Sequence, residues 1–185
     1  MRIAFAGASG TGKTTLMNYV AELRGWPTCP VGARSVAQAM GFASPYDVDA
    51  AGRRAEFQRR LFEGKRAWEA AREHFVTDRS VFDCLAYLLV EGGARSLRDG
   101  EVDEYATAFL RYDAVVLMRM ADFQDLTDPV RVQQRAYHEA YEAILFGFTR
   151  PEFRRRPPSW PEIWVLPYVG LDERKVRIEQ LFTPF

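Results

Sequence analysis

A glycine-rich run near the start of the chain has the composition of a phosphate-binding loop. Residues 7–14 read Gly-Ala-Ser-Gly-Thr-Gly-Lys-Thr, which matches G-x-x-x-x-G-K-[ST] at every defined position. Glycines permit the backbone angles at which successive N–H groups turn inward and bind phosphate oxygens. We therefore expect a nucleoside triphosphate to be bound by Gly7, Ser9, Gly10, Thr11, Gly12, Lys13, Thr14 and Thr15.

Two side chains of this run supply the chemistry that a bound triphosphate needs. Lys13 brings a positive charge to the β- and γ-phosphates, and the Thr14 hydroxyl is a suitable ligand for Mg²⁺. A helix that begins near Lys13 adds the partial positive charge of its N-terminus. ATP and Mg²⁺ are therefore the expected cofactors. The alternative, a glycine turn without a ligand, is disfavoured because an apolar strand precedes the run and a helical pattern follows it.

A second group of candidate residues lies at the end of an apolar stretch. Asp78 would close a strand there, and the carboxyl ends of parallel strands line the ligand crevice. A carboxylate at that place holds Mg²⁺ or accepts a proton from an attacking hydroxyl, and Arg79 offers forked donors to a phosphate or substrate oxygen. Asp83 and Tyr87 share one helix face, so we expect them to bind the substrate together with Arg79. The alternative is that Asp78 caps the next helix and Arg79 pairs with Asp83 at the surface.

Residues elsewhere in the chain extend this set. Gln58, on a long amphipathic helix, has an amide suited to a base or amide of the acceptor, with an exposed side chain as the alternative, and Arg34 is a further candidate for substrate contact. Arg131 and Arg135 share a face of a late helix and would add positive charge over the phosphates, as catalytic residues of a lid around residues 122–135. The alternative for that face is a solvated surface.

Apolar runs alternate with amphipathic segments along the chain, a pattern typical of an α/β fold with a mostly parallel sheet. Strands are expected at residues 2–6, 74–78, 114–118 and 163–166. Helices are expected at residues 13–23, 51–72, 80–91, 128–146 and 171–182, with Ser80 as the N-cap of the third.

The composition indicates a single domain over residues 1–185. Of its residues, 48% are hydrophobic and 27% are charged, the balance of a globular protein. Lys and Arg number 25, as do Asp and Glu, so bulk charge gives no affinity for nucleic acid or membranes. No apolar run reaches the roughly 18 residues of a membrane span, and the N-terminus is unlike a signal peptide. Cys29 and Cys84 suggest no disulfide framework, so we expect a reducing, cytoplasmic location.

An arginine-rich stretch falls in a region that we expect to be a mobile surface loop. Residues 147–161 hold four prolines. Aromatic residues are interleaved with the arginines, a pattern that suits a polynucleotide backbone and stacked bases, although a solvated loop is the commoner interpretation. The candidates for nucleic-acid contact are Arg150, Arg154, Arg155 and Arg156.

Taken together, these motifs resemble the P-loop kinases of nucleosides and nucleotides. The branch that the chain most resembles is the one related to nicotinamide riboside kinases, and thymidylate and deoxynucleoside kinases share the acidic-Arg-Ser element more distantly. The resemblance spans most of residues 1–182 and is diffuse outside the two motifs. It rests on the phosphate loop, on Asp78-Arg79-Ser80 with Asp83 and Tyr87, and on Arg131 and Arg135.

The resemblance implies a three-layer α/β/α fold with a five-stranded parallel sheet. It also implies phosphoryl transfer from ATP with Mg²⁺, with Asp78 near the acceptor hydroxyl and Arg131 and Arg135 in a lid over the phosphates. One segment departs from the branch, which often has an acidic residue shortly before an arginine after its second strand. Here residues 29–34 read Cys-Pro-Val-Gly-Ala-Arg, so the substrate of the branch is not carried over.

The sequence leaves three functions open. The first is an ATP-dependent kinase that phosphorylates a hydroxyl of a nucleoside- or nucleotide-like molecule, with Asp78 as base or positioning group. The second applies the same chemistry to a hydroxyl within a polynucleotide, for which the arginine-rich stretch is the motive and the zero net charge the objection. The third is an ATPase or GTPase switch. Residues 49–52 match D-x-x-G, but they do not follow a strand, and the chain has no N-K-x-D motif.

Overall fold

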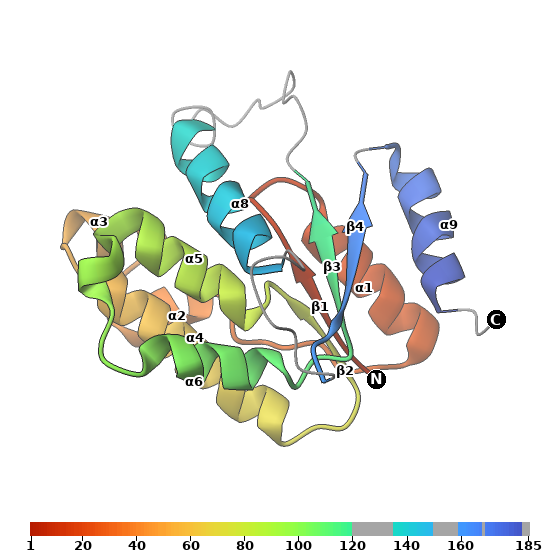
Figure 1. The fold of residues 1–185 in the computed structure, drawn as a ribbon, viewed down its shortest axis with the longest axis horizontal. Coiled ribbons are helices and arrows are strands. Elements are labelled where there is room, and N and C mark those ends of the chain that lie inside the picture. The colour runs from red at the N-terminus through yellow and green to blue at the C-terminus, as the bar shows by residue number, and fades with distance from the viewer. Residues whose placement is uncertain (120–134, 150–158, 168, 183–185) are drawn as a thin grey trace.

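A central parallel sheet with helices on both faces organises the chain (Figure 1). The structure is a computed structural model that describes residues 1–119, 135–149, 159–167 and 169–182. Its four strands stand in the order β2-β1-β3-β4, and every neighbouring pair is parallel. The strands are β1 (Arg2–Ala6), β2 (Phe75–Asp78), β3 (Ala114–Met118) and β4 (Glu162–Leu166).

Each helix that the sequence predicts is present, with its described ends shifted by a few residues, while the expected start of the late helix at residue 128 lies outside the described residues. Three further α-helices and one 3₁₀ turn are not predicted. The described helices are α1 (Lys13–Arg24), α2 (Ala33–Ala39), α3 (Pro45–Ala50), α4 (Arg54–Ala70), α5 (Val81–Gly92), the 3₁₀ turn η1 (Ala94–Ser96), α6 (Glu101–Phe109), α8 (Arg135–Thr149) and α9 (Leu171–Leu181). The unpredicted α2, α3 and α6 have 7, 6 and 9 residues, too few turns for a clear apolar periodicity.

The described sheet has four strands where the resemblance implied five. The fifth position, outside β2, is taken by residues 27–29, which make a single parallel bridge from Thr28 to Val76. The Val76 N–H donates to the Pro27 carbonyl at 3.0 Å, and the Cys29 N–H donates to the Val76 carbonyl at 3.2 Å. Pro27 and Pro30 flank this bridge and have no N–H to donate, which explains why the ladder stops after one residue.

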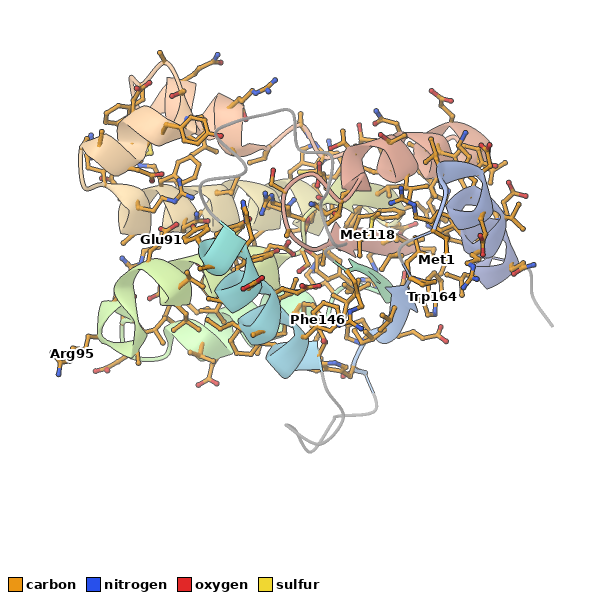
Figure 2. The ribbon with its side chains drawn as sticks, turned by 90° about the horizontal axis from the view of Figure 1, so that it is seen from above. Met1, Glu91, Arg95, Met118, Phe146 and Trp164 are labelled. Carbon is orange, nitrogen blue, oxygen red and sulfur yellow. The ribbon has the colours of Figure 1, made fainter. Side chains whose placement is uncertain are left out.

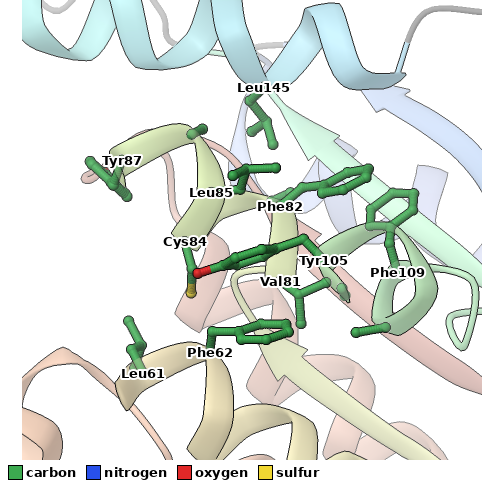
Figure 3. Close-up of a cluster of buried hydrophobic side chains, with 14 of the residues drawn as sticks. Leu61, Phe62, Val81, Phe82, Cys84, Leu85, Tyr87, Tyr105, Phe109 and Leu145 are labelled. Carbon is green, nitrogen blue, oxygen red and sulfur yellow. The ribbon is translucent and has the colours of Figure 1, made fainter. Parts of the chain in front are cut away.

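The alternation of strand residues builds two apolar layers, one on each face of the sheet. On one face, Ile3, Phe5 and Val116 pack with α1 and α9, and Figure 2 shows Met118 and Trp164 on this side. On the other face, strand residues pack with α4, α5, α6 and α8. Figure 3 shows this second cluster, to which these helices contribute Leu61, Phe62, Val81, Phe82, Leu85, Tyr105, Phe109 and Leu145. The three-layer α/β/α fold is therefore confirmed.

The late helix extends beyond its expected end at residue 146. In the described residues α8 begins at Arg135 and continues through Gly147 to Thr149, into the stretch expected to be a loop. The physical reason is Phe148, whose ring packs against Phe82 with centroids 5.1 Å apart and so stabilises the last turn. The expected lid around residues 122–135 lies almost wholly outside the described residues.

The carboxyl ends of the strands meet at one edge of the sheet and bring the two sequence motifs together. Phe5 of β1 is in register with Asp78 of β2, so the chain leaves both strands at the same level. The N–H of Arg79 donates to the Phe5 carbonyl at 2.7 Å and continues the pairing one residue past β2. Among the described helices, none is long and apolar enough to cross a membrane.

Candidate active site

The glycine-rich run forms the connection from β1 to α1, as the sequence predicts. Gly7, Gly10 and Gly12 have positive φ angles of 139°, 83° and 86°. A Cβ on Gly7 would lie 2.3 Å from the carbonyl oxygen of Met118, because the loop passes over the end of β3. Gly7 is therefore required by both its backbone angle and its neighbour.

Lys13 is buried within this loop. Its ammonium donates to the Ala8 carbonyl at 2.5 Å and lies 3.3 Å from the Thr11 hydroxyl. Arg174 of α9, which sequence reasoning missed, supports the loop from outside by donating to the Thr11 carbonyl at 2.7 Å. Its guanidinium lies 3.2 Å from the position of a Cβ on Gly12. These contacts fix the loop around a positively charged centre.

Thr14 and Asp78 meet at the mouth of the loop. The Thr14 hydroxyl donates to Oδ2 of Asp78 at 2.5 Å, and Oδ1 of Asp78 is buried without a hydrogen-bond partner in the described residues. A hydroxyl and a carboxylate are hard oxygen ligands of the kind that Mg²⁺ takes, with water and phosphate oxygens completing its shell. The residues present therefore fit the expected cation. The described residues contain no group of three or more His, Cys, Asp or Glu side chains that would form another metal site.

The N-cap of α5 is Ser80, as the sequence predicts. The alternative, that Asp78 caps this helix, is therefore wrong. The carboxylate of Asp83 accepts hydrogen bonds from the Ser80 N–H and hydroxyl at 2.7 and 2.6 Å. Asp78 is thus left to Thr14 rather than used as a cap.

Asp83 occupies a different place from the one expected. Its carboxylate is fully buried beneath the phosphate loop, where it accepts from the Gly7 N–H at 3.2 Å and from the hydroxyl of Tyr141. It is not among the residues that line the neighbouring cavity. Asp83 therefore supports the glycine-rich loop instead of facing the cavity.

Arg79 and Tyr87 lie together at the wall of a cavity. The Arg79 guanidinium carbon is 4.7 Å from the centroid of the Tyr87 ring, and one of its terminal nitrogens, Nη1, is buried without a hydrogen-bond partner in the described residues. Burial by itself lowers the pKa of Arg79, but Tyr87, Tyr141 and Asp83 raise that pKa well above its ordinary value. The guanidinium therefore stays charged and brings a donor without a described partner to the cavity wall.

The cavity beside the phosphate loop has a volume of about 380 Å³. Five of the predicted site residues, which come from separate segments of the chain, line this cavity together: Ser9, Arg34, Gln58, Arg79 and Tyr87. The remaining lining residues are Ala33, Pro45, Tyr46, Arg54, Phe57, Leu61, Cys84, Tyr137 and His138.

Gln58 is the most informative of the lining residues. Its side chain is only 2% exposed, and its Oε1 is buried without a hydrogen-bond partner in the described part of the chain. A buried amide oxygen of this kind costs free energy unless a ligand or water donates to it. The alternative of an exposed helix side chain is wrong for Gln58.

Arg54 holds the far end of the cavity, and sequence reasoning missed it. Its guanidinium pairs with Asp49 of α3 and Glu91 of α5, both at 2.7 Å, and lies 3.2 Å from the Tyr137 hydroxyl of α8. Figure 2 shows Glu91 well away from Met118 at the end of the sheet. Asp49 is thereby a structural partner within a helix, which agrees with the expectation that the D-x-x-G match follows no strand.

Cys84 also lines the cavity but is not a nucleophile. Burial raises the pKa of its thiol to about 12, so the thiol stays protonated near neutral pH. The cavity therefore offers the guanidinium of Arg79, rather than a thiolate, as a chemical group.

The expected lid residues are not placed. Arg131 and the side chain of Arg135 lie outside the described residues, as do Arg150, Arg154, Arg155 and Arg156. The part of the late helix that is described contributes Tyr137 and His138 to the cavity.

The fold is similar to that of solved small-molecule kinases. A deoxyadenosine kinase from M. mycoides with bound dATP is 16% identical, with a TM-score of 0.63 and coverage of 98% of both chains. A shikimate kinase from Aquifex aeolicus is 16% identical, with a TM-score of 0.56 and coverage of 97% of this chain and 95% of that one. A thymidylate kinase from Ehrlichia chaffeensis is 16% identical, with a TM-score of 0.55 and coverage of 99% and 98%.

The sequence comparisons identify the family. A search of the curated proteins finds no match. A family model described as an AAA domain, AAA_28, matches residues 2–152, which include the glycine-rich loop, Asp78 and every residue that lines the cavity. The chain belongs to the AAA_28 family and has the fold of the P-loop kinases.

Proposed function

We propose that the protein is an ATP-dependent kinase that transfers the γ-phosphate to a hydroxyl of a nucleoside- or nucleotide-like molecule. The observation that carries this proposal is the contact of Thr14 with Asp78. Asp78 thereby meets the phosphate loop, and the next residue, Arg79, lines a cavity of about 380 Å³ that has room for a second molecule. A donor site and an acceptor site that meet at one turn are the arrangement that phosphoryl transfer requires.

Each group has a role in this reaction. The loop N–H groups and Lys13 bind the β- and γ-phosphates, and Asp78 accepts the proton of the attacking hydroxyl or orients that hydroxyl. Thr14 and Asp78 would hold Mg²⁺, which when bound offsets the negative charge of the phosphates. Arg79, charged and with a free donor in the cavity wall, orients the acceptor or a transferred oxygen. Arg131 and Arg135 remain proposed lid residues.

The lining of the cavity favours a flat molecule with polar edges. Phe57, Tyr46 and Tyr87 supply aromatic surfaces, while Gln58 offers a buried acceptor and Arg79 a buried donor. Arg54 is already neutralised by two carboxylates, so the far end of the cavity does not demand an anion. These features support a nucleoside-like acceptor, and solved kinases of deoxyadenosine and thymidylate share the fold.

The experiment is to incubate the protein with ATP labelled on its γ-phosphate and with separate acceptors. The panel contains nucleosides, nucleotides, nicotinamide riboside, shikimate and single-stranded DNA. We expect label in a nucleoside or nucleotide product, and the Asp78→Asn variant serves as the control for contaminating kinases. Label in nicotinamide riboside would assign the branch that the sequence most resembles.

Other outcomes of the same experiment separate the alternatives. Label in DNA would support the polynucleotide acceptor instead, for which the comparisons give no support. Release of free phosphate at the same rate with every acceptor would contradict the kinase and favour the ATPase switch.

A further inference from the structure

A buried ammonium lies behind the turn that carries Asp78 and Arg79. Lys65 of α4 is 1% exposed, and its Nζ donates to the Thr77 hydroxyl at 2.5 Å and to the Asp78 carbonyl at 3.1 Å. A charge in such a place is costly unless it is paired. Its partner is Glu69, one turn along the helix and 2% exposed, with the two charged groups 3.7 Å apart.

The pair is continued to the other side of the turn. Glu69 accepts a hydrogen bond from the Tyr112 hydroxyl at 3.0 Å, and that hydroxyl accepts one from the Val81 N–H at 3.1 Å. The polar chain therefore holds the carbonyl of Asp78 at one end and the N–H of Val81 at the other. These two groups bracket Arg79 and Ser80.

Between these anchors the backbone adopts a strained conformation. Arg79 has a φ of +70°, and it is the only residue other than glycine with a positive φ in the described ranges. Such a conformation is unfavourable for a residue with a side chain and persists only where the surroundings impose it. It turns consecutive side chains in different directions, Asp78 to Thr14 and Arg79 to Tyr87.

We propose that Lys65 is a positioning residue that, through Glu69 and Tyr112, imposes the left-handed turn and so sends Asp78 to the phosphate loop and Arg79 to the cavity. The kinetic part of this inference rests on the proposed kinase function, whereas its structural part does not. Lys65 does not itself line the cavity, and its ammonium donates to Thr77 and Asp78, so the turn is the route by which we expect it to affect the reaction.

The structural part is tested by amide hydrogen exchange in the Lys65→Met variant. We expect exchange in a peptide covering residues 76–82 to accelerate at least tenfold, because the Asp78 carbonyl loses its donor, while residues 114–118 of β3 remain protected. The matched control is Arg66→Met, the next residue of the same helix, whose side chain is exposed and 5.4 Å from the Phe62 ring. This variant should exchange as the wild type does.

Two results would overturn the positioning role. One is unchanged exchange at residues 76–82, and the other is an equal acceleration throughout the sheet, which marks a general packing role. Should Lys65→Met fail to fold, Tyr112→Phe decides the matter, since it removes only the link from Glu69 to Val81. Faster exchange confined to the turn in Tyr112→Phe supports the proposal, and its absence contradicts it.

The kinetic part is tested with the acceptor that the labelling experiment identifies. We expect Lys65→Met to lower kcat at least tenfold with the KM for ATP changed less than threefold, because the phosphate loop itself is untouched. In an Asp78→Asn background the same change should lower kcat less than it does in the wild type, since part of its effect acts through the Asp78 carboxylate and the rest through Arg79. Additive losses would contradict the proposal. If the wild-type protein has no kinase activity, the proposed function is refuted. The structural role of Lys65 is then tested by the hydrogen-exchange experiment alone.

Discussion

Tyr141 of α8 donates a hydrogen bond to Asp83 of α5 directly beneath the first glycine of the phosphate loop. The same hydroxyl lies 3.2 Å from the Gly7 carbonyl, and the Asp83 carboxylate accepts from the Gly7 N–H. All of these groups are buried. The helices α5 and α8 thus support the beginning of the glycine-rich loop.

Removing this hydroxyl should destabilise the protein. In Tyr141→Phe the buried carboxylate loses one of its donors, so we expect the free energy of unfolding to fall by about 1–3 kcal/mol. Urea denaturation measures the change. The matched control is Tyr46→Phe, whose side chain is 53% exposed and should change stability by less than about 0.5 kcal/mol. Equal stability of the two variants would contradict the buried network.

Loss of the loop cation should abolish turnover while the fold survives. In Lys13→Ala the γ-phosphate loses its nearest positive charge, and we expect kcat to fall by about 10²–10³ or more. Circular dichroism should show the wild-type secondary structure. Near-normal turnover in this variant would refute the assignment of the phosphate loop.

Neutralising the carboxylate at the strand end tests the chemical step. We expect Asp78→Asn to lower kcat by about 10² or more, because an amide neither accepts the proton of the hydroxyl nor holds a cation as a carboxylate does. The control is Asp172→Asn at the fully exposed start of α9. If Asp78→Asn lowers the stability of the protein but leaves kcat unchanged, Asp78 has a structural role and not a chemical one.

The buried amide in the cavity should act on the acceptor and not on ATP. In Gln58→Leu the acceptor loses a hydrogen-bond partner, so its KM should rise about tenfold while the KM for ATP stays within about twofold. Gln38→Leu, on the exposed face of α2, is the matched control. A rise in the KM for ATP instead would place the acceptor elsewhere.

Acid should weaken the contact between α4 and α6 in a defined range of pH. Arg59 of α4 and Glu101 of α6 form an ion pair that joins the two helices. Hydrogen bonds from Arg59 lower the pKa of Glu101 from its ordinary value of 4.5 to about 2. Because the pKa is depressed on folding, the stabilisation is present above about pH 4.5 and is lost as the pH falls through about 2. The stabilisation at neutral pH is at most about 3 kcal/mol.

The comparison of wild type with Glu101→Gln isolates this effect. The difference between their free energies of unfolding should be largest at neutral pH and should shrink between about pH 4.5 and pH 2. A difference that is constant over this range would show that the ion pair does not contribute.

The sequence predicts those parts of the site whose residues are close together in the chain. The phosphate loop is a run of consecutive residues, and Asp78 is found because an apolar strand ends there. The spacing of Asp83 from Tyr87 predicts the correct helix for Asp83 but not its neighbours, because spacing within one helix does not reveal that Tyr141 covers it. The periodicity of apolar residues shows which face of a helix is buried, but it does not show which other segment packs on that face.

The residues that sequence reasoning missed all act across long separations in the chain. Arg54 contacts Glu91 and Tyr137, which lie far along the chain. Arg174 likewise contacts the glycine-rich loop near the opposite end of the sequence. Lys65 reads as an ordinary charge on an amphipathic helix, yet it is buried against β2. The fold class followed from alternating strands and helices, whereas the short helices and the single bridge at Thr28 depend on tertiary contacts.

The most direct test of the central claim is calorimetric titration of the protein with a non-hydrolysable ATP analogue in the presence of Mg²⁺. The account predicts heat of binding with one site per chain for the wild type and a large loss of affinity for Lys13→Ala. A folded wild-type protein that gives no heat, and no binding by equilibrium dialysis, would contradict the claim that residues 7–14 bind a triphosphate.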